Sequence, residues 1–75
     1  MKYLLLRPIN ASMFNMDVSS FIRVTKEHYH CDIVTSYHQM YLTGSKDDLE
    51  TLVSDNDLDG MIIEYTGVYD QVINE

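Results

Sequence analysis

The order in which strand-like and helix-like apolar patterns follow one another constrains this chain more than any other feature. Residues 2–7 form an apolar run that stops at Pro8, which is typical of a buried strand. Residues 17–30 then carry apolar side chains at helical spacing, and Asp17 is placed to cap the first turn. The predicted inner face of this helix consists of Val18, Phe21, Ile22 and Tyr29. The chain therefore starts with a strand followed by an amphipathic helix.

The middle of the chain predicts a β-hairpin and a second helix. Residues 31–36 and 39–43 are rich in β-branched and aromatic side chains, with a polar interruption between them. Ser45, with Asp48 three residues later, is a variant of the capping box, so we expect the second helix to begin there. Its predicted apolar stripe consists of Leu49, Leu52 and Val53.

The end of the chain predicts one more strand and a short helix. In residues 61–66, alternation places Met61, Ile63 and Tyr65 on one face of a strand. Residues 68–75 can form a terminal helix of about two turns. The resulting order βαββαβ(α) predicts an α+β open-faced sandwich, in which helices cover one face of a four-stranded, mainly antiparallel sheet.

The size of the chain and its single cysteine limit its organisation. Residues 1–75 are expected to form one domain, because a chain this short rarely supports a second core. Cys31 has no second cysteine to pair with, which excludes an intramolecular disulfide. No apolar run approaches the roughly 18 residues of a membrane span, and the start does not resemble a signal peptide. We therefore expect a cytoplasmic protein with no membrane partner.

The order of elements resembles the HPr family, the phosphocarrier proteins of the bacterial sugar phosphotransferase system, whose fold runs β-α-β-β-α-β-α. The resemblance rests on Phe21 in the first helix, CDIVTS entering the second strand, Ser45 beginning the second helix, and Gly60 with MIIEYTG in the last strand. Family members carry a phosphoacceptor histidine followed by an arginine at the start of the first helix, and SMFNMDVSS has neither. The resemblance therefore implies a regulatory protein that lacks the phosphocarrier histidine.

One regulatory site is also implied by this resemblance. In HPr proteins of some bacteria, the serine that caps the second helix is phosphorylated. Ser45 is the nearest match here, which makes it a candidate phosphosite. The alternative function for Ser45 is helix capping alone.

Charge is distributed very unevenly along the sequence. Residues 1–46 contain five basic and three acidic residues, a net charge of +2. Residues 47–75 contain nine acidic and no basic residues, a net charge of −9. Such a negative field repels phosphate backbones and attracts basic surfaces. We therefore expect a basic protein partner and no direct binding of nucleic acid.

The stretch DNDLDGMIIEYT partly matches a calcium-binding loop. Asp55, Asp57 and Asp59 occupy the alternating ligand positions, and Gly60 follows where such loops need a glycine. Position 12, which requires a bidentate glutamate, is Thr66. The alternative interpretation is a turn between a helix and a strand, with Gly60 at positive φ.

A second set of residues suggests zinc. His28, His30, Cys31 and His38 offer imidazole and thiol ligands, although they lack the paired two-residue spacing of zinc ribbons. The alternative is three solvated histidines and a partly buried thiol. Our sequence-based prediction contains no metal site and no cofactor.

Tyrosine is frequent in this chain, with six residues of this type. Tyrosine suits binding faces because one end of its side chain is apolar and the other forms hydrogen bonds. We expect a small acidic, non-enzymatic protein that binds and modulates or inhibits a partner with a basic surface, with nucleic-acid mimicry as one route. The predicted partner-binding residues are Tyr37, Tyr41, Asp47, Asp48, Glu50, Asp55, Asp57, Asp59 and Tyr65. The two alternative functions are a regulatory HPr-like protein and a small metal-binding protein. The sequence leaves open whether the chain forms a homo-oligomer.

Overall fold

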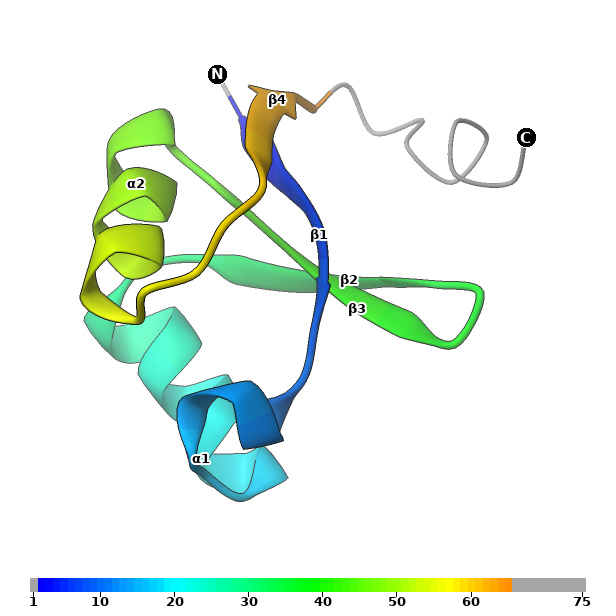
Figure 1. The fold of residues 1–75 in the computed structure, drawn as a ribbon, viewed down its shortest axis with the longest axis vertical. Coiled ribbons are helices and arrows are strands. Elements are labelled where there is room, and N and C mark those ends of the chain that lie inside the picture. Colours follow the sequence, from blue (N-terminus) through cyan, green and yellow to red (C-terminus); the bar gives the residue numbers. More distant parts are fainter. Residues whose placement is uncertain (1, 66–75) are drawn as a thin grey trace.

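The computed structural model describes residues 2–65, which form a four-stranded sheet with helices packed on one face (Figure 1). The elements in chain order are β1 (Tyr3–Ile9), the 3-10 turn η1 (Ala11–Phe14), α1 (Val18–Arg23), the π-helical turn η2 (Val24–His28), β2 (Asp32–Ser36), β3 (Gln39–Gly44), α2 (Lys46–Asp55) and β4 (Met61–Glu64). The predicted α+β open-faced sandwich is therefore confirmed. The predicted terminal helix, residues 68–75, lies outside the described residues.

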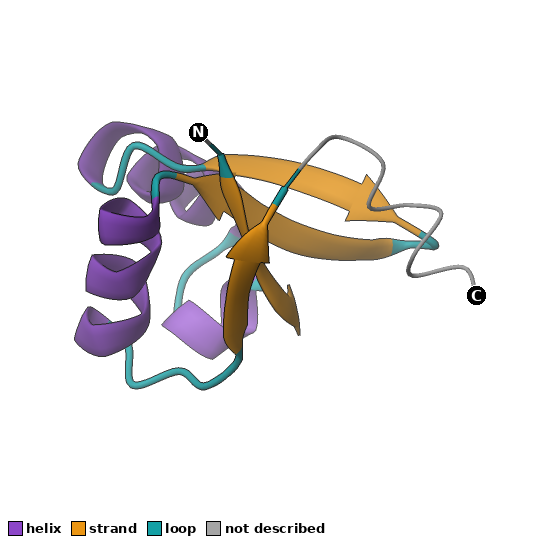
Figure 2. Cartoon of the chain, turned by 90° about the horizontal axis from the view of Figure 1, so that it is seen from above, coloured by secondary structure: helices purple, strands orange, loops and turns teal. Residues whose placement is uncertain are grey.

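The sheet has the order β2-β3-β1-β4, and all neighbouring strands are antiparallel. Consequently β1 and β2 run parallel to each other with β3 between them, and β3 and β4 run parallel with β1 between them. These are two interlocked split βαβ units, in which α1 and α2 each connect two parallel strands. Both helices pack on the same face of the sheet, where each of them returns the chain to the start of the next strand (Figure 2).

The main core lies between the helices and the sheet. It is built from Leu5, Ile9, Ala11, Phe14, Phe21, Cys31, Leu42, Leu49 and Leu52. Both predicted N-caps are confirmed. The Asp17 carboxylate accepts from the Ser20 amide, and the Ser45 hydroxyl accepts from the Asp48 amide at 3.1 Å.

The first strand continues past Pro8, so its predicted end at residue 7 was wrong. Leu5 pairs with Leu42 and Ile9 pairs with Met40. An interval of four residues in β1 therefore lies opposite an interval of only two residues in β3. The register shift between these pairs contains Pro8, which has no amide to contribute to a ladder. A proline is tolerated where regular pairing is interrupted in this way.

The inner face predicted for the first helix was also partly wrong. Val18 and Ile22 are 58% and 38% exposed, whereas Phe21 and Thr25 are each only 1% exposed. Phe21 and Thr25 are four residues apart, which is α-helical spacing, so the buried stripe is rotated toward these two side chains and away from Val18 and Ile22. The π-helical turn begins after Ile22, and within it the Tyr29 amide donates to the Val24 carbonyl, five residues earlier, at 3.2 Å.

The predicted hairpin is present, and its turn has unusual residues. Tyr37 and His38 form a two-residue turn with φ angles of 50° and 66°. Positive φ at both positions is typical of the type I′ turn, which normally contains Asn or Gly. The hairpin projects away from the helices (Figures 1 and 2). No helix within residues 2–65 has the length and apolar character to cross a membrane.

Candidate functional site

The candidate site lies on the surface, because residues 2–65 enclose no pocket. Within the same residues, no group of three His, Cys, Asp or Glu side chains is placed to hold a metal ion. What the fold does gather is negative charge along α2 and along the connection to β4. We call this the acidic surface, and it consists of Asp47, Asp48, Glu50, Asp55, Asp57 and Asp59.

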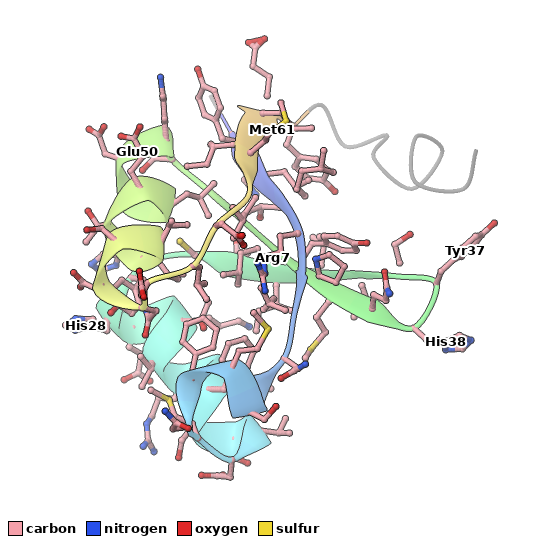
Figure 3. All side chains as sticks on the ribbon, in the orientation of Figure 1. Arg7, His28, Tyr37, His38, Glu50 and Met61 are labelled. Atoms are coloured by element: carbon pink, nitrogen blue, oxygen red, sulfur yellow. The ribbon has the colours of Figure 1, made fainter. Side chains whose placement is uncertain are left out.

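The helix α2 directs its carboxylates outward because its apolar residues anchor the other face. Leu49 and Leu52 are fully buried against the sheet. Asp47, Glu50 and Asp55 are exposed and Asp48 is half-exposed. Figure 3 shows Glu50 pointing away from the sheet. A partner can therefore approach these side chains without disturbing the core.

The N-terminal end of α2 is favourable for negative charge. Asp47 and Asp48 lie in the first turn, where negative charge complements the helix dipole. Ser45 is exposed and caps the helix through its hydroxyl oxygen. Its phosphorylation stays a prediction.

The C-terminal end of α2 is unfavourable for negative charge. The Leu58 amide donates to the Val53 carbonyl at 3.0 Å and the Asp57 amide to the Ser54 carbonyl at 3.4 Å, which together form a Schellman motif. Asp57 occupies the left-handed position of this motif, with φ of 53°, where glycine is usual. Asp55 lies in the last turn, and no basic residue does. Two carboxylates thus lie at the negative end of the helix dipole.

The segment proposed for calcium is a helix end followed by a turn. Asp55 belongs to α2, Asp57 forms the left-handed position, and Asp59 makes an ion pair with Arg7 of β1. Gly60 has φ of 134°, and a Cβ there would lie 3.1 Å from both Arg7 and Leu5. The turn interpretation of this stretch is therefore confirmed, including the need for glycine.

Arg7 is a contributor to this surface that sequence reasoning missed. It neutralises part of the charge of Asp59, and its Nε is buried without a hydrogen-bond partner. The available signal was a basic residue inside an apolar strand, since such a residue usually needs an acidic partner. The sequence could not identify that partner, because Arg7 and Asp59 are brought together only by the fold.

Tyr29 connects the end of the π-helical turn to the acidic surface. Its hydroxyl donates to Asp55 at 3.2 Å and accepts from the Asn56 amide group at 3.4 Å, and Asn56 also donates to the Leu52 carbonyl at 2.9 Å. Burial raises the pKa of Tyr29, and the contact with Asp55 adds to this increase. The C-terminal end of α2 is thereby held in a fixed position.

The residues considered for zinc lie apart. His28 and His30 are exposed near the end of η2, and His38 lies at the distant hairpin turn (Figure 3). Cys31 is buried, and its thiol donates to the Tyr29 carbonyl at 3.4 Å. Burial, with added repulsion from Asp48 and Asp32, raises the pKa of Cys31 to about 11, so the thiolate is disfavoured.

The predicted tyrosines do not join the acidic surface as a group. Tyr37 is 65% exposed, but it lies at the hairpin turn, on the opposite side of the molecule from Glu50 (Figure 3). Tyr41 is only 4% exposed and its hydroxyl donates to Gln39 at 2.8 Å, so it offers a partner little surface in this structure, and its role in binding stays a prediction. It packs with Leu4 on the helix-free face of the sheet. Tyr65 is half-buried beside the same cluster.

Comparisons of the chain with protein-family models, with curated proteins and with solved structures found no significant match, so the resemblance to the HPr family stays a prediction.

Proposed function

We propose that this protein binds a partner protein through the acidic surface and modulates or inhibits that partner by occupying its basic surface. The observation that carries the proposal is the position of Asp55 and Asp57 at the C-terminal end of α2. Both carboxylates lie where the helix dipole disfavours negative charge.

The energetic cost of this arrangement supports a role in binding. A charge at the unfavourable end of a helix costs about 0.3–1 kcal/mol. The left-handed conformation adds a steric cost, which is smaller for aspartate than the roughly 1–2 kcal/mol of most non-glycine residues. A domain of this size has a stability of only about 3–5 kcal/mol from its core. The helix dipole and the backbone conformation, taken alone, favour a basic residue near position 55 and glycine at position 57, although Asp55 also accepts the hydrogen bond from Tyr29. A cationic partner would relieve the electrostatic part of this cost.

The charge density of α2 suits imitation of a nucleic acid. The helix contains ten residues, which corresponds to a length of about 15 Å. Its acidic residues are Asp47, Asp48, Glu50 and Asp55, with Lys46 as its basic residue. Four carboxylates over this length give about one carboxylate per 4 Å, or about one net negative charge per 5 Å when Lys46 is included, compared with about one phosphate per 3.4 Å along one strand of DNA. We therefore propose a nucleic-acid-binding protein as the partner class.

Competitive capture tests this function. The immobilised protein should retain a partner from extracts of its native cell at low salt, and duplex DNA should displace that partner. The double variant Asp55→Asn/Asp57→Asn should retain at least fivefold less. Glu27→Gln neutralises one exposed carboxylate on η2 outside the acidic surface, so it controls for a loss of charge elsewhere and should retain as much as the wild type. Equal retention by wild type and double variant would rule out this surface as the binding site.

A further inference from the structure

The outer edge of β4 is the most distinctive surface that the proposed function leaves unused. β4 is an edge strand, hydrogen-bonded to β1 and to no other strand among residues 2–65. The Tyr65 amide donates to the Lys2 carbonyl at 3.0 Å, which fixes the hydrogen-bonded positions of this antiparallel pair. Because these positions alternate along the strand, the backbone groups of Ile62 and Glu64 point away from β1.

Among residues 2–65, no strand pairs with these outward backbone groups. Within the same residues, no hydrogen bond joins the backbone groups of Ile62 and Glu64 to another segment. Edge strands are usually protected by lysine, proline or a bulge. β4 has the sequence MIIE and regular pairing, so it contains no lysine, proline or bulge, although it is only four residues long and carries the charge of Glu64. Met61 on this strand is 65% exposed.

The charges around this edge indicate which strand it can accept. Glu64 is exposed on β4 itself, and α2, which carries Glu50, packs against β4. Asp59 lies two residues before the strand, where Arg7 offsets part of its charge. Figure 1 shows α2 and β4 beside each other. A second copy of this chain is disfavoured, since pairing two β4 edges would bring two acidic surfaces together in molecules of net charge −7.

We propose that an extended, basic segment of the partner protein adds to the sheet as a fifth strand beside β4. Main-chain hydrogen bonds with Ile62 and Glu64 would hold the segment, and alternate side chains would select it. Lysine or arginine opposite Glu64 complements its charge, and an apolar residue opposite Ile62 extends the half-buried row on the helix face. This inference rests on the proposed function and adds the mode of docking.

A pair of substitutions at one residue separates backbone pairing from charge. Glu64→Pro removes the outward amide without removing a bond to β1, whereas Glu64→Gln removes only the charge. The probe is a capped seven-residue peptide in which lysine and valine stand two positions apart, with threonine between them, so that lysine lies opposite Glu64 when valine lies opposite Ile62. Relative to Glu64→Gln, Glu64→Pro should bind this peptide at least tenfold more weakly. Circular dichroism of both variants establishes that they are folded.

A second measurement uses the unaltered protein. N-methylation of the peptide amides that would face β4 leaves its charge unchanged and should weaken binding at least tenfold. On binding of the unmethylated peptide, hydrogen exchange at the amides of Ile62 and Glu64 should slow at least tenfold. Unchanged affinity for the methylated peptide, or unprotected amides, would overturn the edge proposal.

These outcomes separate the two proposals. If the peptide binds in a salt-dependent way that N-methylation does not affect, the acidic surface binds basic segments and the edge is not involved. If Asp55→Asn/Asp57→Asn captures the cellular partner as well as the wild type does, the proposed function fails, whatever the peptide shows. Protection of Ile62 and Glu64 that increases with protein concentration in the absence of peptide would identify a second copy as the occupant and would also overturn the proposal.

Discussion

The amide of Asp57 donates to the carbonyl of Ser54 at 3.4 Å, and this contact holds an acidic residue in the left-handed position at the end of α2. Glycine adopts this conformation without steric cost and carries no charge against the helix dipole. Asp57→Gly is therefore expected to stabilise the fold by about 1 kcal/mol.

Denaturant unfolding measures that change, and partner capture measures its consequence. Asp57→Asn, which also suits the left-handed conformation, removes the charge and keeps a side chain of similar shape. Both variants should be more stable than the wild type and weaker in binding. A variant that gained stability and kept full binding would show that the Asp57 charge has no role in recognition.

The hairpin turn offers a second stabilising change. Tyr37 and His38 both have positive φ, and Asn-Gly is the preferred pair for such a turn. Tyr37→Asn/His38→Gly should raise the free energy of unfolding by roughly 1–2 kcal/mol. Because the turn lies far from α2, we expect unchanged binding at the acidic surface (Figure 3). Loss of binding in this variant would assign the hairpin turn to the recognition surface.

Tyr29 should give the protein a distinct alkaline transition. Its pKa is raised above the ordinary value of 10.0, chiefly by burial, so the folded state favours the protonated hydroxyl. Its stabilising contribution is present below pH 10 and is lost as the pH rises through the raised pKa. Tyr29→Phe should therefore lose about 0.5–1.5 kcal/mol at neutral pH, because the bonds to Asp55 and Asn56 are removed. Unfolding measured from pH 8 to pH 11 should show a steeper decline for the wild type than for Tyr29→Phe, and equal slopes would contradict this assignment.

Cys31 is expected to be unreactive in the native state. Its thiol is buried and its pKa is about 11, so very little thiolate exists near pH 8. Labelling by iodoacetamide should be at least tenfold slower in the folded protein than in denaturant. Gly44→Ala is a sensitive probe of this site, because the added Cβ would lie 3.2 Å from the Cys31 sulfur. Fast labelling of the folded wild type would contradict the packing described for this thiol.

The order of elements could be predicted because it depends on local patterns. Asp17 and Ser45 cap the helices as expected, since an N-cap needs only a short polar side chain directly before a helical pattern. The face buried by the first helix could not be predicted, because tertiary packing buries the polar Thr25 and leaves the apolar Val18 exposed. The sequence alone does not show that the first strand continues past Pro8, because the irregular pairing that accommodates the proline depends on β3.

The charge of the candidate site could be predicted from the sequence, but its geometry could not. The acids from Asp47 to Asp59 are evident from the sequence, and their gathering on α2 and its connection to β4 follows from helical periodicity. The burial of Tyr41 could not be predicted, because both faces of the sheet pack apolar side chains, so alternation alone does not identify an exposed tyrosine. The ion pair of Arg7 with Asp59 and the open edge of β4 depend on the strand order, which no local pattern specifies.

The most direct test of the central claim is the salt dependence of affinity for the captured and purified partner. Titration between about 50 and 500 mM salt should show affinity falling steeply for the wild type, because screening removes the attraction between opposite charges. Asp55→Asn/Asp57→Asn should bind more weakly at low salt with a clearly shallower slope, and Glu27→Gln should match the wild type. An affinity that is independent of salt and equal in all three proteins would contradict the account.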